Sequence, residues 1–157
     1  MRGRKIEGRE EYTMENGVSY ARLEMGGTER FVPLRQQLGV TSFGMNLMLL
    51  HPGARGRIHR HAKQEEVYLV LEGTLSLSIE GAERDVGVGE LARVAPEVRR
   101  QLINRGPARL AILALGAAGE HVGRDGTAFA SWDAKDGAPP QEIPLPEDLP
   151  LSERRSG

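Results

Sequence analysis

The 157-residue sequence contains no cysteine, so disulfides, thiolate metal sites and cysteine nucleophiles are all excluded. Aromatic residues make up only 4% of the chain, against 39% hydrophobic residues in total, so we expect a core of aliphatic side chains. Charged residues make up 27%, yet the formal net charge is only −1. This balance gives no reason to expect nucleic acid or an anionic membrane as a partner.

Long apolar runs are also absent. No segment approaches the roughly 20 apolar residues that span a bilayer, and the N-terminal region is polar, without the apolar core of a signal peptide. We therefore expect a cytoplasmic protein without membrane contact. A nucleophile elbow, a phosphate-binding loop and a dinucleotide fingerprint are missing too, which argues against those enzyme classes.

The chain does contain a series of short segments with β character, separated by glycine, proline and asparagine turns. Thr74–Glu80 alternates most clearly, because Leu75, Leu77 and Ile79 fall on one face of a strand. No convincing amphipathic helix lies between the segments, so the pattern predicts an all-β antiparallel barrel or sandwich. The other expected strands cover residues 18–23, 30–34, 43–51, 57–61, 67–71, 83–86, 91–94, 99–103 and 110–115.

The length of the chain suits a single domain. The series of expected strands divides this chain into three parts. Residues 1–16 form a polar N-terminal arm, residues 17–116 the barrel, and residues 117–157 a C-terminal extension that is Pro-rich from 137. Five of the nine prolines lie between Gly137 and Pro150, so this tail should be extended rather than helical. We expect the tail to lie on the barrel, and a subunit-crossing arm is the alternative.

The candidate site lies between Gly53 and Gly73. His59 and His61 are two positions apart, so both imidazoles leave the same face of an extended strand. Glu66 follows after a short turn and begins the next strand. Two neutral imidazoles and one carboxylate from adjacent strands suit a divalent transition metal, and the same ligands accept Fe, Mn, Ni or Zn.

The spacing of these residues resembles the first motif of the cupin family. The five motif positions, in register without a gap, are Gly53, His59, His61, Glu66 and Gly73. The resemblance covers roughly residues 40–115. It implies a single jelly-roll β-barrel (the double-stranded β-helix) with a pocket open at one end. It also implies a homodimer that binds a small molecule and holds a metal through the two histidines and the glutamate.

The second cupin motif is degraded. Gly89 and Asn104 fit its frame, and we expect a structural hydrogen-bonding role for Asn104. Three positions depart from the motif: Ala95, Glu97 and Arg100 stand where a proline, a glycine and the third metal-binding histidine are usual. Because a guanidinium has no lone pair to give to a metal, Arg100 leaves two alternatives open.

In the first alternative, His59, His61 and Glu66 alone hold the metal, and Arg100 binds an anionic small molecule beside it, as in a dioxygenase- or isomerase-like enzyme. In the second, the guanidinium of Arg100 pairs with Glu66 in a metal-free, non-catalytic binding or sensing cupin. A divalent ion and a guanidinium a few ångströms apart repel strongly where screening is poor, so the second alternative stands beside the first, which is the leading hypothesis. The residues leave open whether the protein is an enzyme.

Alternate residues of a strand share one face, and this parity adds further candidate site residues. Tyr68 lies on the face of the carboxylate ligand, where it either lines the pocket or fills the barrel. Arg57 lies on the face of His59, where it supplies a second positive charge for an anionic ligand or points to solvent. His51 is expected at the surface. His121 follows the last expected strand and becomes a ligand only if its segment folds back over the barrel mouth.

Both faces of the segment Val67–Leu71 carry apolar side chains. One face fits the barrel interior, and the other needs cover from a second sheet or a partner subunit, which also favours a homodimer. A structural or accessory protein that acts through this face and the proline-rich tail is a third hypothesis.

Overall fold

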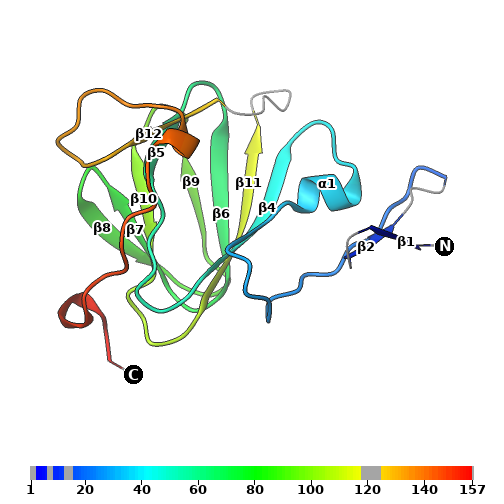
Figure 1. Cartoon of the computed structure of the whole chain (residues 1–157), viewed down its shortest axis with the longest axis horizontal. Coiled ribbons are helices and arrows are strands. Elements are labelled where there is room, and N and C mark those ends of the chain that lie inside the picture. The colour runs from blue at the N-terminus through cyan, green and yellow to red at the C-terminus, as the bar shows by residue number, and fades with distance from the viewer. Residues whose placement is uncertain (1–2, 7–8, 13–15, 118–124, 157) are drawn as a thin grey trace.

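The computed structural model describes residues 3–6, 9–12, 16–117 and 125–156. Two five-stranded antiparallel sheets face each other and form a jelly-roll barrel, which confirms the predicted all-β fold (Figure 1). One sheet contains, in spatial order, β12 (Gly126–Phe129), β5 (Ile58–His61), β10 (Arg100–Ile103), β7 (Leu75–Ile79) and β8 (Ala82–Val86). The other contains β3 (Phe31–Val32), β4 (Gly44–Leu50), β11 (Leu110–Ala117), β6 (Glu65–Glu72) and β9 (Leu91–Val94).

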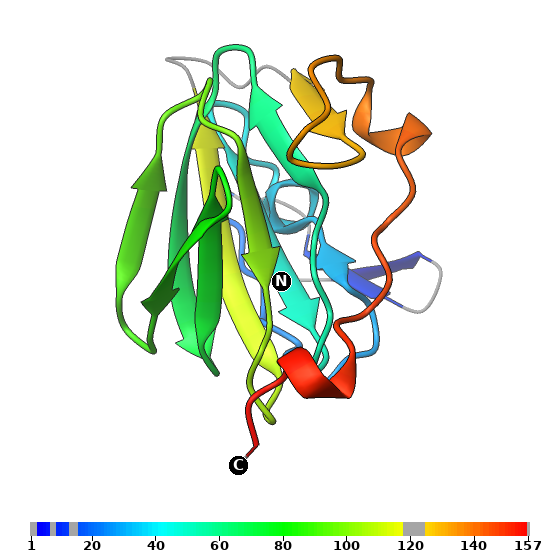
Figure 2. The ribbon, with the colours of Figure 1, turned by 90° about the vertical axis from the view of Figure 1, so that its left-hand side faces the viewer.

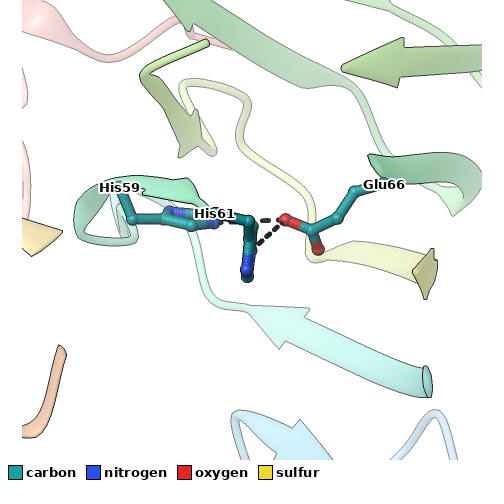
Figure 3. Close-up of side chains that lie close together, drawn as sticks. All are labelled: His59, His61 and Glu66. Atoms are coloured by element: carbon teal, nitrogen blue, oxygen red, sulfur yellow. Dashed lines mark ion pairs between the residues drawn. The ribbon is translucent and has the colours of Figure 1, made fainter. Parts of the chain in front are cut away.

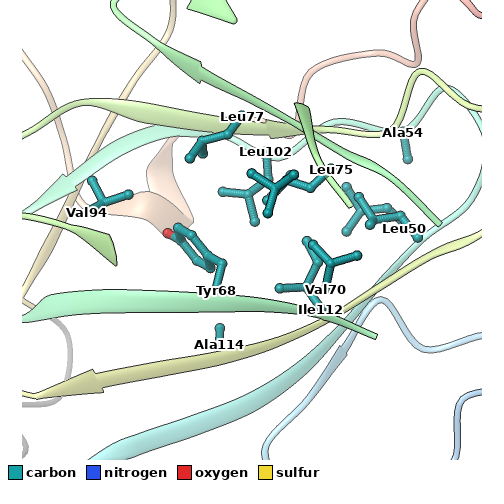
Figure 4. Packing of buried hydrophobic residues seen from close by; sticks show 12 residues of the cluster. Leu50, Ala54, Tyr68, Val70, Leu75, Leu77, Val94, Leu102, Ile112 and Ala114 are labelled. Atoms are coloured by element: carbon teal, nitrogen blue, oxygen red, sulfur yellow. The ribbon is translucent and has the colours of Figure 1, made fainter. Parts of the chain in front are cut away.

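The core lies between the two sheets and is aliphatic, apart from one tyrosine ring (Figure 4). Both sheets contribute through the alternation read from the sequence: Leu75 and Leu77 of β7 point inward toward Val70 of β6. Burying each such side chain contributes roughly 1.5–3 kcal/mol to the stability of the fold, so an aliphatic core can form with few aromatic residues. The other buried members of the cluster are Leu50, Ala54, Tyr68, Val86, Val94, Leu102, Leu110, Ile112 and Ala114.

The two glycines that bound the first motif have a steric reason to be glycine. Gly53 and Gly73 adopt positive φ angles of +85° and +77°, which L side chains rarely adopt. A Cβ at Gly73 would also collide with the carbonyl oxygen of Arg109. Asn104 has the expected structural role, since its buried amide donates hydrogen bonds to the carbonyls of Leu50 and Ala108, each at 2.9 Å.

The outer face of the second sheet is covered in part by a helix that the sequence did not predict. The expected strand over residues 30–34 is wrong at its end: β3 stops at Val32, and the helix α1 (Leu34–Leu38) begins after Pro33. Proline has no N–H for a strand ladder, so pairing ends there. Leu34 packs against the outward-facing Leu47 and Leu49. No helix in the described part of the chain is long and apolar enough to cross a membrane.

The predicted strand over residues 18–23 is also wrong. Residues 19–24 have no regular secondary structure, and Val18, Tyr20 and Leu23 remain exposed. The apolar side chains of this segment have no neighbouring sheet face to pack against among the residues that the structure describes. A strand depends on such packing more than on the intrinsic β propensity of its residues. Before this segment, β1 (Gly3–Ile6) and β2 (Arg9–Tyr12) form a separate two-stranded hairpin away from the barrel (Figure 1).

The C-terminal extension adds to the barrel in two ways. Strand β12 was not predicted, and it extends the first sheet by pairing Gly126 with His61 and Ala128 with His59. The tail, with 3₁₀ turns at Pro140–Glu142 and Leu151–Glu153, then runs along the outside of the same chain's barrel (Figure 2). Backbone bonds hold its far end: Leu149 N–H donates to the Gly53 carbonyl at 2.8 Å.

Candidate metal centre

The fold brings together the three residues that the first motif singles out. His59 and His61 lie on β5 of one sheet, and Glu66 lies on β6 of the other, because the short turn between these strands crosses from sheet to sheet. One nitrogen of each imidazole and one carboxylate oxygen all lie within 4.8 Å of one another (Figure 3). A set of two histidines and one carboxylate is a donor set that transition metals accept.

The hydrogen bonds around the two imidazoles fix their tautomers. His59 Nδ1 lies 3.0 Å from the carbonyl oxygen of Arg57, and His61 Nδ1 lies 2.7 Å from Oδ1 of Asp125. Both partners are acceptors, so each Nδ1 carries a proton and donates it. Each Nε2 then has its lone pair available on the side of Glu66, as in metal-binding histidines oriented by an acceptor on the other nitrogen.

Both Nε2 atoms face the same oxygen of Glu66. The distance to Oε1 is 3.4 Å from His59 and 2.6 Å from His61 (Figure 3). The approach of His61 is short but not aligned for a hydrogen bond, and its buried Nε2 has no hydrogen-bond partner within the described residues. A buried imidazole nitrogen without a hydrogen bond is unusual, and a bound cation would satisfy it.

Asp125 contacts the candidate site, although the sequence did not predict it. Its side chain is only 5% exposed. Besides His61, it accepts the backbone N–H groups of Lys63 and Gln64 at 3.0 and 2.9 Å. Burial alone would raise the pKa of Asp125, but these backbone donors and His61 outweigh burial and lower it. One ionised carboxylate thus fixes both the β5–β6 turn and the orientation of His61.

We predict that Asp125→Asn lowers the metal affinity of the site by about 10- to 100-fold, the range found when such an orienting partner is lost. Both oxygens of Asp125 accept hydrogen bonds: Oδ1 from His61 and from Gln64 Nε2, the latter at 2.8 Å, and Oδ2 from the Lys63 backbone. The NH2 group of an asparagine would therefore face a donor in either orientation. Competition with a chromophoric chelator measures the affinity. The exposed Asp136→Asn is the control, and equal affinities for the two variants would contradict an orienting role for Asp125.

Glu66 is held as a carboxylate by a dense set of donors. Its Oε1 also lies 3.1 Å from Nη2 of Arg100 and accepts the hydroxyl of Tyr68 at 3.1 Å. Burial alone would raise the pKa of Glu66, but in the absence of a metal the two histidines, when protonated on Nε2, outweigh that effect and hold this pKa well below its usual range. Tyr68 is buried inside the barrel with its hydroxyl bonded, and burial raises its pKa. It also lines a cavity beside the histidines, so both predicted roles of Tyr68 describe its position.

The side chain of Arg100 is fully buried. Besides Glu66, its guanidinium donates from Nη1 to the carbonyls of Pro96 and Val98, at 3.1 and 2.7 Å, and from Nε to the Tyr68 hydroxyl at 3.3 Å. It lines neither of the cavities that border the histidines. Direct contact of Arg100 with an anionic ligand stays a prediction, while its pairing with Glu66 is present in the structure.

Two cavities border the imidazoles of His59 and His61. One, of about 290 Å³, extends over the side of Glu66 and Tyr68. The other, of about 420 Å³, shares Phe31 and Met48 with the first cavity and includes the predicted ligand contact Arg57. Both fall near or within the range of roughly 300–1,000 Å³ that is usual for small-molecule pockets.

The two remaining histidines contribute no ligand in the described region. His51 is 62% exposed and pairs with Asp148 at 2.5 Å on the surface, as expected. His121 falls in residues 118–124, outside the described residues.

Comparison with known proteins shows which domain and which fold this chain resembles. Residues 46–116 match the family model of the cupin domain. A cupin protein of Bacteroides fragilis has the same fold, with a TM-score of 0.59 and 22% identity over 69% of this chain and 90% of that chain. A sugar phosphate isomerase from a cupin superfamily, from Silicibacter pomeroyi, has a TM-score of 0.58 and 27% identity over 74% of this chain and 79% of that chain.

A putative sugar phosphate isomerase of Acidithiobacillus ferrooxidans is similar at a TM-score of 0.55, with 18% identity over 75% of this chain and 80% of that chain. No curated protein gives a significant match. Residues 46–116 therefore match a cupin domain, and the chain has the two-sheet jelly-roll fold of these cupin structures.

Proposed function

We propose that this protein is a metal-binding cupin that holds a divalent transition metal through His59, His61 and Glu66 and binds an anionic small molecule beside it. The observation that carries the proposal is the pair of Nε2 atoms facing one carboxylate oxygen, with both Nδ1 atoms committed to acceptors. A histidine pair that served only to fill the barrel would not need this shared orientation.

A metal bound there would supply Lewis-acid or oxygen-activating chemistry. The chain's own residues would orient it: Asp125 fixes His61, and Arg100 with Tyr68 fixes Glu66. An isomerase- or dioxygenase-like reaction suits such a site, and the Silicibacter pomeroyi structure carries the name of a sugar phosphate isomerase. An anionic small molecule as ligand is consistent with that name and with Arg57 at the cavity wall.

A specific observation favours a second function, a metal-free binding or sensing module. Arg100 lies 3.1 Å from the Glu66 oxygen that a metal would need. Burial alone would lower the pKa of His61, but the adjacent carboxylates of Glu66 and Asp125 outweigh it and raise this pKa. A protonated His61 would then occupy the site in place of a metal.

Metal content separates the two functions. The protein is purified without a histidine tag, equilibrated with Fe²⁺, Mn²⁺, Ni²⁺ or Zn²⁺ in turn, desalted and analysed for bound metal. Retention of a metal that depends on His59 supports the first function, and absence of retention with all four ions supports the second.

We further propose that the protein is a homodimer that pairs through the outer face of β6 and β9. Leu69 and Leu91 lie opposite each other on these strands, facing away from the core, and Leu91 is 65% exposed. Helix α1 covers the sheet at β4 rather than at β9, so this end of the face keeps its apolar side chains partly in water.

We predict that Leu91→Glu converts the dimer to a monomer, because two carboxylates would be buried across a two-fold axis. Light scattering coupled to size-exclusion chromatography measures the mass. Val88→Glu is the matched control, since Val88 is 64% exposed but lies in the turn before β9. A wild-type protein that elutes as a monomer at all concentrations would refute the proposed interface.

A further inference from the structure

The cavity of about 420 Å³ beside His59 and His61 has walls from distant parts of the chain. Phe31 comes from β3, Met48 from β4 and Leu102 from β10, while Pro140 and Leu145 come from the C-terminal tail. The tail therefore completes the cavity rather than only packing on the barrel, and the wall that it completes is apolar.

Two guanidiniums border this cavity. Arg30 precedes β3, and its Nη2 donates to the carbonyl oxygen of Arg55. Arg57 precedes β5, and its Nε donates to the carbonyl oxygen of Ile143 in the tail at 2.7 Å. Each side chain is thus anchored by one nitrogen. Within residues 16–117 and 125–156, the other side-chain nitrogens of both arginines have no hydrogen-bond partner, so they are available to a ligand.

The two positive charges are close enough to repel. Burial lowers the pKa of Arg30, Asp148 opposes that decrease, and Arg57 adds to it. Asp148 therefore already offsets part of the charge of Arg30. An anion in the cavity would offset more of the two half-buried charges, because guanidiniums bind carboxylates and phosphates through paired N–H donors.

The rest of the lining selects the kind of anion. Apart from Arg30, Arg57 and the two histidines, every described residue that lines this cavity is apolar or glycine: Phe31, Met48, Gly56, Leu102, Gly126, Pro140 and Leu145. A sugar phosphate would bury several hydroxyls there without partners, at a cost of about 1–3 kcal/mol each. A hydrocarbon body would gain free energy from the same wall.

We propose that this cavity binds an organic acid with a hydrocarbon body, whose carboxylate pairs with Arg30 and Arg57 and whose other end reaches His59 and His61. This inference rests on the proposed function, because it names the ligand class of the same site. Arg30 and Arg57, rather than the buried Arg100, then recognise the negative charge. Specificity comes from an apolar wall that rejects polyhydroxylated anions.

Isothermal titration of metal-free protein with 3-phenylpropionate, its uncharged amide and glucose 6-phosphate tests the proposal. We expect the acid to bind at least about tenfold more tightly than the amide, because the amide cannot form charged hydrogen bonds with the two arginines. Glucose 6-phosphate should bind more weakly than the acid. Arg30→Gln and Arg57→Gln should each remove most of the preference for the acid over the amide.

Arg55→Gln is the matched control, because Arg55 makes an equivalent bond to the tail, from Nε to the Glu147 carbonyl at 2.8 Å, but does not line this cavity. It should keep the preference for the acid. Thermal melting of each variant verifies folding, and Arg57→Gln alone tests the proposal if Arg30→Gln fails to fold.

Equal binding of acid and amide, tighter binding of glucose 6-phosphate, or no saturable binding of either 3-phenylpropionate or octanoate would overturn the proposal. His59→Ala separates this result from the metal proposal. Arginine-dependent acid binding that survives in His59→Ala supports the cavity assignment even if no metal binds. Metal binding without any preference for the acid supports the metal site and overturns the cavity assignment.

Discussion

Protein purified without a histidine tag and equilibrated with a divalent transition metal is expected to retain about one ion per chain, and His59→Ala is expected to retain almost none. The wild-type site offers three donors that already converge, so binding needs no rearrangement of the backbone. Removing His59 leaves two donors, too few for a stable site. Inductively coupled plasma mass spectrometry on desalted protein measures the ratio of metal to chain.

Two neighbouring residues provide matched controls for this experiment. His51→Ala removes a surface imidazole whose one ion pair among the described residues is with Asp148, so it should retain the metal. Glu66→Gln should lose most of it, whereas Glu65→Gln should not, because Glu65 points outward to Arg93 at 2.6 Å. Equal metal content in wild type and His59→Ala would exclude the three-residue site. In that case the Arg100–Glu66 pair becomes the natural description of the barrel interior.

Arg100→Met is expected to destabilise the metal-free protein by about 3 kcal/mol, the lower end of the range for removing one partner of a buried ion pair. The variant removes a donor from the Val98 carbonyl and leaves the Pro96 carbonyl with the backbone N–H of His61. It also removes the guanidinium from Glu66, which keeps its contacts with the histidines and Tyr68. Urea unfolding of metal-free protein, followed by circular dichroism, gives the change in the free energy of unfolding.

Arg93→Met is the control for Arg100→Met, since Arg93 forms an exposed pair with Glu65 that should contribute less than about 1 kcal/mol. The folded fraction of Arg100→Met should also bind metal more tightly than wild type does, because the wild-type guanidinium repels a cation bound to the same carboxylate. A variant as stable as wild type would show that Arg100 does not stabilise Glu66. Unchanged metal affinity would show that the guanidinium and the ion do not compete.

The parts of the site that could be predicted are those encoded by local spacing. The positions of His59 and His61 on one strand face, and of Glu66 at the start of the next strand, follow from a period of two residues and one short turn. The jelly roll follows from the series of short alternating segments that includes Thr74–Glu80. Such patterns survive folding because strand geometry alone decides which side chains share a face.

The residues that could not be predicted come from distant segments. Asp125 lies 64 positions from His61, in a stretch with no strand or helix period. Strand β12 follows it and has a weak sequence signal, Gly-Thr-Ala-Phe, so only pairing with β5 makes it a strand. Arg30 reaches the cavity through the irregular segment before β3. In each case tertiary packing decides the position, and the local sequence carries no trace of it.

Arg100 shows the same limit in a different form. The sequence identified its position in the degraded second motif and left open whether it contacts a ligand or Glu66. That choice depends on side-chain direction and burial inside the barrel, which strand parity alone does not determine. The motif position did put Arg100 beside the candidate ligands, and in the structure Arg100 pairs directly with His59 across β10 and β5.

The donors of the candidate site come from both sheets of the barrel, His59 and His61 from one and Glu66 from the other. An ion bound there would act as a cross-link between the sheets, and separating the sheets would require its release. Occupancy and folding would then be thermodynamically linked: an ion at about 1,000 times its dissociation constant adds about 4 kcal/mol to the free energy of unfolding. In a cell, the lifetime of the folded protein would follow the supply of free metal, and chelation would act as a destabilising mutation does.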